Sequence, residues 1–151
     1  MRIAIGCDHG GFQLKESVKK HLKLNEFEVI DFGTNSRESV HFPNYALKVG
    51  ISVKQGESEL GVLCCGTGIG MSIAANKIKG IRASVVNDCF SAKATKEHNG
   101  SNVLCLGERV LGEGLALSIV DTWIKAEFQG GRHEERLNQV KNLEENYARG
   151  K

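Results

Sequence analysis

The stretch 60-LGVLCCGTGIGMSIAANK-77 carries the pattern that decides the fold of this chain. It opens with an unbroken apolar run at 60–65, which has the length and character of a strand buried on both faces of a parallel sheet. A loop with glycine at every second position follows, and a helix is expected over 71–78. A buried strand, a glycine loop and a helix in succession indicate an α/β protein.

The rest of the chain repeats this alternation. Further strands are expected at 3–7, 27–32, 81–86 and 102–106, and further helices at 12–24, 43–55, 88–97, 112–128 and 133–149. Apolar residues recur at helical spacing in the sets Leu14, Val18, Leu22 and Leu115, Ile119, Trp123. We therefore predict a Rossmann-like three-layer α/β/α sandwich with a five-stranded parallel sheet and an extra C-terminal helix, in a single domain over 1–151.

The bulk composition excludes several classes of function. The 151 residues carry a net charge of only +2 and no stripe of Lys and Arg, which argues against a nucleic-acid partner. No apolar run is long enough to span a membrane, and the N-terminal stretch MRIAIGCDHGG lacks the features of a signal peptide. We therefore expect a cytoplasmic protein without a membrane partner.

The five cysteines sit mostly in apolar runs, and no CxxC pair occurs. This pattern is typical of reduced thiols, and it argues against a disulfide framework or a metal site. Neighbouring side chains of a strand point to opposite faces, so Cys64 should pack in the core while Cys65 opens onto the glycine loop. The start of the next helix would stabilise a thiolate there, which makes Cys65 a candidate base. The expected packing residues are Cys7, Cys89 and Cys105.

Ligands of open parallel sheets bind beyond the carboxyl ends of the strands. In this chain, polar and glycine residues gather at those ends, over 7–11, 32–34, 65–68, 87–88 and 107–109. We therefore expect the site at this edge of the sheet.

The glycine loop at 66–70 has two interpretations. It is either a tight turn that only joins strand to helix, or a cradle in which backbone N–H groups approach an anion beside a helix N-terminus. Three common phosphate loops are excluded. Met71 stands where a dinucleotide fingerprint needs its third glycine, no Gly-Lys-Ser/Thr sequence is present, and no arginine follows either cysteine at the spacing of a cysteine phosphatase.

Two histidines adjoin predicted strands. Asp8 and His9 follow the first strand, and His98 and Asn99 end a helix just before the last strand. We place both histidines on the ligand side of the sheet, where imidazoles can move protons near pH 7. The alternative for a histidine at a helix end is a cap or an ordinary surface group.

Arg132 and Arg136 lie four residues apart, so their side chains share one helix face at a separation of about 5–6 Å. Two guanidinium groups suit a phosphate or a carboxylate, and the alternative is a solvated face shared with the neighbouring glutamates. His133 between them, like His21 of an earlier helix, is expected to be an exposed helix residue. The narrow apolar stripe of the last helix could dock on a second subunit.

Several short motifs resemble one known family when they are taken together and in order. They are GCDHGGF with LK, CGTGIGMSIAANK, GIRA, EHNGSNVLCLG and GGRHEER. Spread along nearly the whole chain, they resemble the ribose-5-phosphate isomerase B family, also called the ribose/galactose isomerase family.

This resemblance implies an aldose–ketose isomerase that converts ribose 5-phosphate to ribulose 5-phosphate through an enediol intermediate, without a metal or a redox cofactor. It also implies a homodimer or homotetramer in which residues of both subunits form each site. The helix at 133–149 would then dock on the partner subunit.

The resemblance further assigns roles to individual residues. Cys65 would move a proton between two neighbouring carbons, assisted by the hydroxyl of Thr67. His98 would open the furanose ring, with Asp8 nearby. The enediolate oxygens would be bound by N–H groups of Gly66, Thr67, Gly68, Ile69 and Gly70. The phosphate would be bound by His9, Arg109, Arg132 and Arg136, the last three from the partner subunit, and a sugar hydroxyl by Asn99.

One departure from the family concerns the substrate. Many relatives have Asp-Tyr-Pro where this chain has His41, Phe42 and Pro43, and a histidine there also resembles galactose-6-phosphate isomerases. Galactose 6-phosphate and allose 6-phosphate are therefore alternatives to ribose 5-phosphate, which the His98-Asn99 pair and GGRHEER favour. Two rival functions are a non-catalytic sensor of sugar phosphates or nucleotides, and a dinucleotide-dependent oxidoreductase. The second has a candidate ribose-binding acid in Asp31 but lacks the glycine fingerprint.

Overall fold

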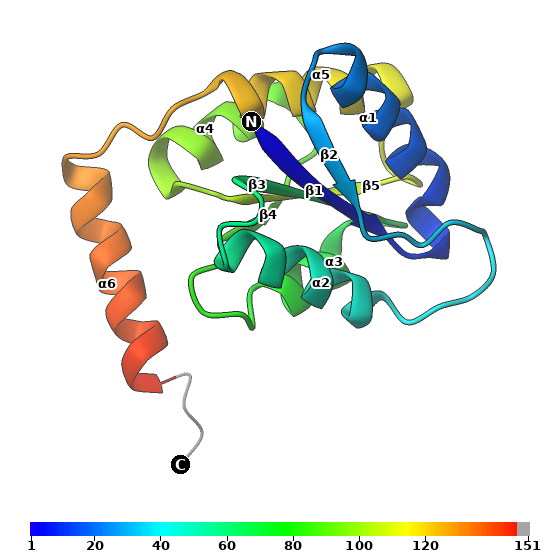
Figure 1. Ribbon diagram of the computed structural model, residues 1–151. Coiled ribbons are helices and arrows are strands. Elements are labelled where there is room, and N and C mark those ends of the chain that lie inside the picture. The colour runs from blue at the N-terminus through cyan, green and yellow to red at the C-terminus, as the bar shows by residue number, and fades with distance from the viewer. Residues whose placement is uncertain (148–151) are drawn as a thin grey trace.

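The structure is a computed structural model that describes residues 1–147, and it shows a parallel sheet between two layers of helices (Figure 1). The strands are β1 (Arg2–Cys7), β2 (Glu28–Asp31), β3 (Leu60–Cys65), β4 (Ala83–Val85) and β5 (Val103–Gly107). The helices are α1 (Phe12–Leu24), α2 (Phe42–Lys54), α3 (Ile69–Ala75), α4 (Cys89–Asn99), α5 (Glu113–Lys125) and α6 (Arg132–Tyr147), with a 3-10 turn η1 at His9–Gly11. The predicted α/β sandwich with five parallel strands is confirmed.

The strand order, which the sequence pattern did not reveal, is β2-β1-β3-β5-β4. From β1 the chain moves outward to β2, and after α2 it returns to the other side of β1, where β3 pairs with it. The direction of winding therefore reverses between β1 and β3, which is where ligands of open α/β sheets bind. Cys7 is the register partner of Cys64, so the residues that follow these two strands emerge side by side.

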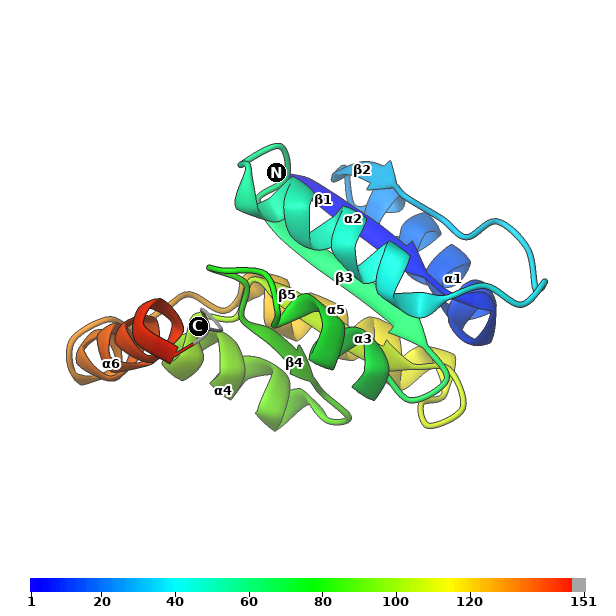
Figure 2. The ribbon, with the colours of Figure 1, turned by 90° about the horizontal axis from the view of Figure 1, so that it is seen from below.

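Two apolar clusters fill the space between the sheet and its helix layers. α1, α4 and α5 pack on one face, and α2 and α3 on the other (Figures 1 and 2). Every residue of β3 and β5 is buried, as expected for central strands of a parallel sheet. Cys64 lies in the first cluster and Cys65 in the second, so the two neighbouring thiols do point to opposite faces.

The spacing of apolar residues predicted most of the buried helix faces correctly. α1 has the predicted bounds, and its buried face is formed by Leu14, Val18 and Leu22 together with one lysine. The prediction for α5 was wrong at one position, because Leu115 is 45% exposed while Ile119 and Trp123 are fully buried. A spacing of four residues drifts by about 40° per step around a helix, so two steps carry Leu115 off the buried face. α3 is also shifted, since it covers Ile69–Ala75 rather than 71–78.

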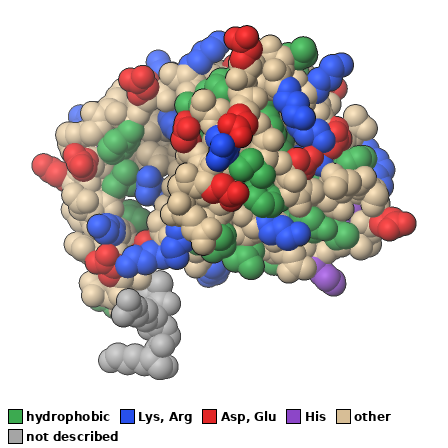
Figure 3. Space-filling view, in the orientation of Figure 1, with side chains coloured by type: hydrophobic (Ala, Val, Ile, Leu, Met, Phe, Trp, Pro, Cys, Tyr) green, Lys and Arg blue, Asp and Glu red, His purple; other side chains and the backbone are tan. Residues whose placement is uncertain are grey.

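α6 stands at the side of the molecule, next to α4 and beyond the β4 edge of the sheet (Figure 2). An open hollow between α6 and the body is visible in the space-filling view (Figure 3), with a volume of about 900 Å³. The predicted helix at 133–149 begins at Arg132 and is described to Tyr147, while positions 148 and 149 lie outside the described residues. The apolar side chains of Val140 and Leu143 are exposed on it.

None of the helices within residues 1–147 combines the length and the apolar character that crossing a membrane requires.

Candidate active site

The carboxyl edge of the sheet brings together several of the predicted site residues from one chain. Asp8 and His9 follow β1, the glycine loop follows β3, and Arg109 follows β5. β3 pairs with both other strands, so its loop lies between the other two groups. The backbone after β1 lies directly against the end of β3. Only glycine fits at position 11, because a Cβ on Gly11 would lie 2.3 Å from the carbonyl carbon of Cys64.

Cys65 is the last residue of β3, and only 6% of it is exposed. Its Sγ accepts a hydrogen bond from the backbone N–H of Gly68 at 3.0 Å. This hydrogen bond orients the sulfur atom toward the glycine loop. The thiol therefore faces the loop at the carboxyl edge of the sheet.

The glycine loop wraps around this sulfur atom. Gly68 has φ +80°, a left-handed conformation that favours glycine, and a Cβ there would lie 3.1 Å from the backbone of Leu106. α3 begins directly after it, so its first amides lack partners within the helix. The N–H of Ile69 is bonded to the hydroxyl oxygen of Thr67 at 3.3 Å. Within residues 1–147, the N–H groups of Gly70 and Met71 have no protein acceptor, so they can donate to a bound group.

Asp8 and His9 are held by backbone contacts. The Oδ1 of Asp8 accepts the N–H of Gly10 at 2.8 Å, so this buried carboxylate caps the η1 turn. The Nδ1 of His9 accepts the N–H of Val40 at 3.2 Å, which orients a half-buried imidazole. Asp8 therefore shapes the turn on which His9 is presented.

Arg109 lies against the glycine loop of its own chain. A Cβ on Gly66 would be 3.0 Å from Nη1 of Arg109, and a Cβ on Gly10 would be 3.6 Å from its Nη2. The guanidinium group therefore reaches the Cys65 edge without a second subunit, which differs from the expected approach across a subunit boundary. A side chain on Gly66 would crowd the guanidinium group in this position, whereas the distance at Gly10 is that of an ordinary van der Waals contact.

His98 and Asn99 lie at the other edge of the sheet, which corrects the placement of His98 on the ligand side. α4 runs back from the carboxyl end of β4 to the amino end of β5, and these residues are its last two. At about 3.3 Å per residue, β5 alone separates this edge from Cys65 by about 13 Å. His98 is therefore remote from both Cys65 and Asp8 within one chain.

His133 was expected to be exposed and is instead buried, with 8% of it exposed. Its ring stacks on His98 with the centroids 4.5 Å apart. Burial and the positive charges of His98, Arg132 and Arg136 lower the pKa of His133. The structure therefore gathers the His98-Asn99 pair and the two arginines of α6 into a second, cationic cluster at the amino edge. His21 is half-buried, with its Nε2 2.7 Å from Oδ1 of Asp121.

The other cysteines carry no such arrangement. Burial raises the pKa of Cys64 and Cys105, and it raises the pKa of Cys7 to about 12. Cys89 is half-buried and packs against the first apolar cluster. Their surroundings fit the predicted packing role. Residues 1–147 contain no group of three or more His, Cys, Asp and Glu side chains placed to hold a metal ion.

Two contributors to this edge, Val40 and Lys15, were not found from the sequence, and a third, Phe42, was singled out there only as a departure from the family. The N–H of Val40 binds His9, the ring of Phe42 lies 3.1 Å from where a Cβ on Gly70 would be, and Lys15 is fully buried below the edge. A backbone donor leaves no signal in a sequence. Lys15 occupies a polar position beside the apolar stripe of α1, and only its buried partners distinguish it from a surface lysine.

Comparison with known proteins gives the same assignment for the whole chain. A family model described as Ribose/Galactose Isomerase matches residues 3–140. Among curated proteins, the chain is 48% identical to a protein named ribose-5-phosphate isomerase B from Escherichia coli, over 95% of this chain and 97% of that protein. It is also 48% identical to a putative sugar phosphate isomerase of Bacillus subtilis, over 96% of this chain and 98% of that protein.

Solved structures agree with the sequence relatives. The structure of Clostridium thermocellum ribose-5-phosphate isomerase B matches with a TM-score of 0.97 and 54% identity, over 97% of this chain and 99% of that one. That of Mycoplasma genitalium ribose-5-phosphate isomerase B with bound ribulose 5-phosphate matches with a TM-score of 0.91 and 38% identity, over 96% and 97%. The family model, the curated relatives and the solved structures all match nearly the full length of the chain. The chain belongs to the ribose/galactose isomerase family.

Proposed function

We propose that this chain is an aldose–ketose isomerase that converts ribose 5-phosphate to ribulose 5-phosphate, with Cys65 as the base. The observation that carries the proposal is the position of the Cys65 sulfur. Cys65 is the last residue of β3, and its sulfur accepts the Gly68 N–H at 3.0 Å beside the glycine loop, where further N–H groups have no protein acceptor within residues 1–147. The two ribose-5-phosphate isomerases B described above, from Escherichia coli and Clostridium thermocellum, support the substrate.

The proposed chemistry moves one proton between two carbons. In the open-chain aldose, the Cys65 thiolate removes the proton from C2, the electron pair forms the C1=C2 double bond, and the carbonyl electrons move to O1. The amides of the glycine loop stabilise the resulting enediolate charge. A proton passes from O2 to O1, and the Cys65 thiol returns its proton to C1, which gives the ketose.

The phosphate requires cations at some distance from this base. Arg109 and His9 are beside the glycine loop in the same chain, and they supply one part of the binding site. Arg132 and Arg136 supply the other part, together with His98 for ring opening and Asn99 for a sugar hydroxyl. These four residues stand at the amino edge, so one chain cannot bring all the proposed groups to one substrate.

A homodimer or homotetramer removes this separation. We propose that the amino-edge cluster of one subunit faces the carboxyl edge of another, with α6 docked on the partner. The exposed Val140, Leu143 and Tyr147 side chains on α6 provide an apolar surface for that contact. A two-fold arrangement would form two complete sites, because each subunit would supply one edge to each.

The test of the reaction is turnover of the purified protein with ribose 5-phosphate, galactose 6-phosphate and allose 6-phosphate, with EDTA present throughout. We expect turnover of ribose 5-phosphate. Preference for a six-carbon phosphate would move the assignment to that sugar and would give the His41-Phe42 departure a role in specificity. Binding of all three without turnover would favour the sensor interpretation.

The test of the shared site is complementation between two inactive variants. Cys65→Ala and His98→Asn subunits are mixed, partly unfolded and refolded together. If sites are shared, each mixed dimer contains one site with both native residues, so activity returns. If each chain forms its own site, every site in the mixture lacks one residue and activity stays absent.

A further inference from the structure

We propose that Lys15 is a positioning residue for this site, an inference that rests on the proposed function. Together with Asp31 and Asn35 it fastens the β2–α2 loop, defined as residues 32–41, to α1. The far end of that loop holds the imidazole of His9 in a single tautomer. Lys15 acts through the loop, since its ammonium group bonds to neither the glycine loop nor His9.

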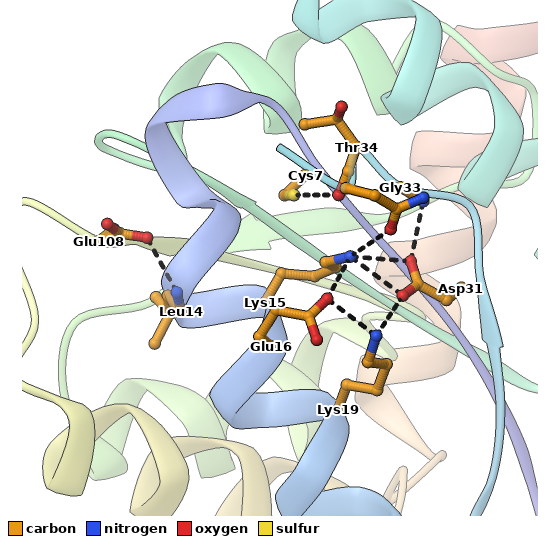
Figure 4. A network of polar contacts seen from close by, with 10 residues as sticks. Cys7, Leu14, Lys15, Glu16, Lys19, Asp31, Gly33, Thr34 and Glu108 are labelled. Atoms are coloured by element: carbon orange, nitrogen blue, oxygen red, sulfur yellow. Dashed lines mark hydrogen bonds and ion pairs between the residues drawn. The ribbon is translucent and has the colours of Figure 1, made fainter. Parts of the chain in front are cut away.

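The ammonium group of Lys15 is fully buried and has partners on two segments (Figure 4). Its Nζ lies 3.0 and 3.1 Å from the carboxylate oxygens of Asp31, 3.2 Å from Oδ1 of Asn35 and 2.7 Å from Oε1 of Glu16. A buried charge is costly unless its hydrogen bonds are all made, so the group demands these partners in place. Asp31 ends β2 and Asn35 lies in the loop, so one ammonium group clamps both sides of the point where the chain leaves the sheet.

The first part of the loop is joined to β1 directly above this clamp. Asp31 also accepts the N–H of Gly33 at 2.8 Å, and the N–H of Thr34 donates to the carbonyl of Cys7 at 2.7 Å. The thiol of Cys7 donates to the carbonyl of Thr34 (Figure 4). Cys7 precedes Asp8 and His9, so the clamp fixes the loop against the strand that presents His9.

The second part of the loop contacts the site. The guanidinium group of Arg37 lies 3.3 Å from Oε1 of Glu108, and Oε2 of Glu108 accepts the N–H of Leu14 in the first turn of α1 at 2.9 Å. Three residues later, the N–H of Val40 donates to Nδ1 of His9 at 3.2 Å. The loop is therefore attached to α1 at two points, by Lys15 through Asn35 and by Arg37 through Glu108.

The hydrogen bond from the Val40 N–H determines which ring nitrogen of His9 carries the proton. A ring nitrogen accepts an N–H only when it carries a lone pair, so Nδ1 is unprotonated and the proton of the neutral ring lies on Nε2. Within residues 1–147, no protein group bonds Nε2. His9 therefore offers one directed N–H donor, which suits an oxygen of a phosphate group. A displaced loop would release Nδ1, and the ring could rotate and exchange tautomers.

The test compares Lys15→Met with Lys19→Met. Lys19 makes a matched control, because its Nζ lies 2.8 Å from both Glu16 and Asp31 but does not contact Asn35. In Lys15→Met, we expect the ring ¹⁵N signals of His9 to change from one tautomer to an averaged pair. We expect KM for ribose 5-phosphate to rise on the order of tenfold with kcat within about twofold, since the phosphate contact is made in ground and transition states alike. Lys19→Met should change neither reading.

A second variant keeps the proposal testable if Lys15→Met does not fold. Asn35→Ala removes only the loop partner of the ammonium group from an exposed position, and it should shift the His9 signals and KM in the same direction. A folded Lys15→Met or Asn35→Ala protein with native His9 signals would overturn the proposal, as would Lys19→Met with the same changes as Lys15→Met. The ¹⁵N measurement needs no turnover, so a protein inactive on ribose 5-phosphate would contradict the proposed function while this test still decides the role of Lys15.

Discussion

The imidazole rings of His98 and His133 are stacked, with centroids 4.5 Å apart and 11° between the ring planes. This contact joins the end of α4 to the start of α6, and it places the two arginines of α6 beside the proposed ring-opening residue. The amino-edge cluster therefore depends on how firmly α6 is held against α4.

The first prediction concerns pH. The pKa of His133 is lowered below its usual 6.5 by burial and by nearby positive charges, so the docked helix favours the neutral ring. The undocked helix binds the proton more readily, so docking weakens as pH falls below about 6.5. Amide-exchange protection of α6 should be lower at about pH 5.5 than at about pH 7.5. His133→Phe keeps a ring for stacking and should remove this difference; an unchanged difference would assign it to another group.

The second prediction separates the two adjacent thiols. Cys65→Ala should lower kcat/KM by about 10²–10⁴-fold, the usual effect of losing a general base, and should leave the fold intact. Cys64→Ala should reduce the free energy of unfolding by about 1 kcal/mol through a small cavity while turnover persists. Isomerisation assays and denaturant unfolding on both variants check this. Near-normal turnover by Cys65→Ala would show that another group is the base.

The third prediction concerns the contact between the Phe42 ring and Gly70 of the glycine loop. Gly70→Ala would place a methyl group 3.1 Å from the Phe42 ring, so the ring must move away from the glycine loop. We expect lower kcat, and partial recovery in the Gly70→Ala/Phe42→Leu double variant. Gly114→Ala is the control, because a Cβ there meets nothing within 4 Å and the position lies in α5. Equal kcat for Gly70→Ala and Gly114→Ala would contradict a role for this contact.

The fourth prediction concerns acid stability. Burial alone would raise the pKa of Asp31, but hydrogen bonds from Lys19, Gly33 and Lys15 outweigh it and lower the pKa below its usual 3.8. The ionised carboxylate therefore stabilises the fold above about pH 3.8, and this contribution is lost as pH falls through the lower folded value. Urea unfolding between about pH 5 and 2.5 should show a shallower pH slope for Asp31→Asn than for the native chain. Parallel slopes would mean that other carboxylates dominate.

The fifth prediction tests the arginine pair of α6. Arg136→Ala should raise KM more for ribose 5-phosphate than for unphosphorylated ribose at the concentrations each requires, because only the former carries the dianion that a guanidinium binds. Steady-state kinetics with both sugars measure this difference. The same fold-change for both sugars would remove Arg136 from the phosphate site.

The elements of the fold were predictable because each has a local cause. The apolar run Leu60–Cys65 matches β3 to the residue, and Asp88 caps α4 by accepting the N–H of Ser91. The carboxyl-edge residues followed from the same reasoning, because every parallel strand delivers its next residue to one edge. Site residues that lie within two or three positions of a strand end were therefore within reach of sequence reasoning.

The amino-edge cluster was harder to predict, since its position depends on where whole helices end. His98 precedes β5 in the chain, so it belongs to the edge where strands begin, and its distance from Cys65 follows only once that direction is applied. The burial of His133 depends on contact between α4 and α6, which no periodicity encodes. Lys15 was missed because its partners Asp31 and Asn35 come from a different segment.

The alternation along β3 has one consequence for how this chain can change in length. Cys64 and Cys65 are identical neighbours. Which of them faces the loop depends only on whether it occupies an odd or an even position in the pairing of β3 with β1 and β5. A deletion of a single residue upstream within β3, with the pairing kept, would carry Cys65 into the place of Cys64 and turn the proposed base into the core. Insertions and deletions in this strand are therefore constrained even where the replaced residues are interchangeable hydrophobes.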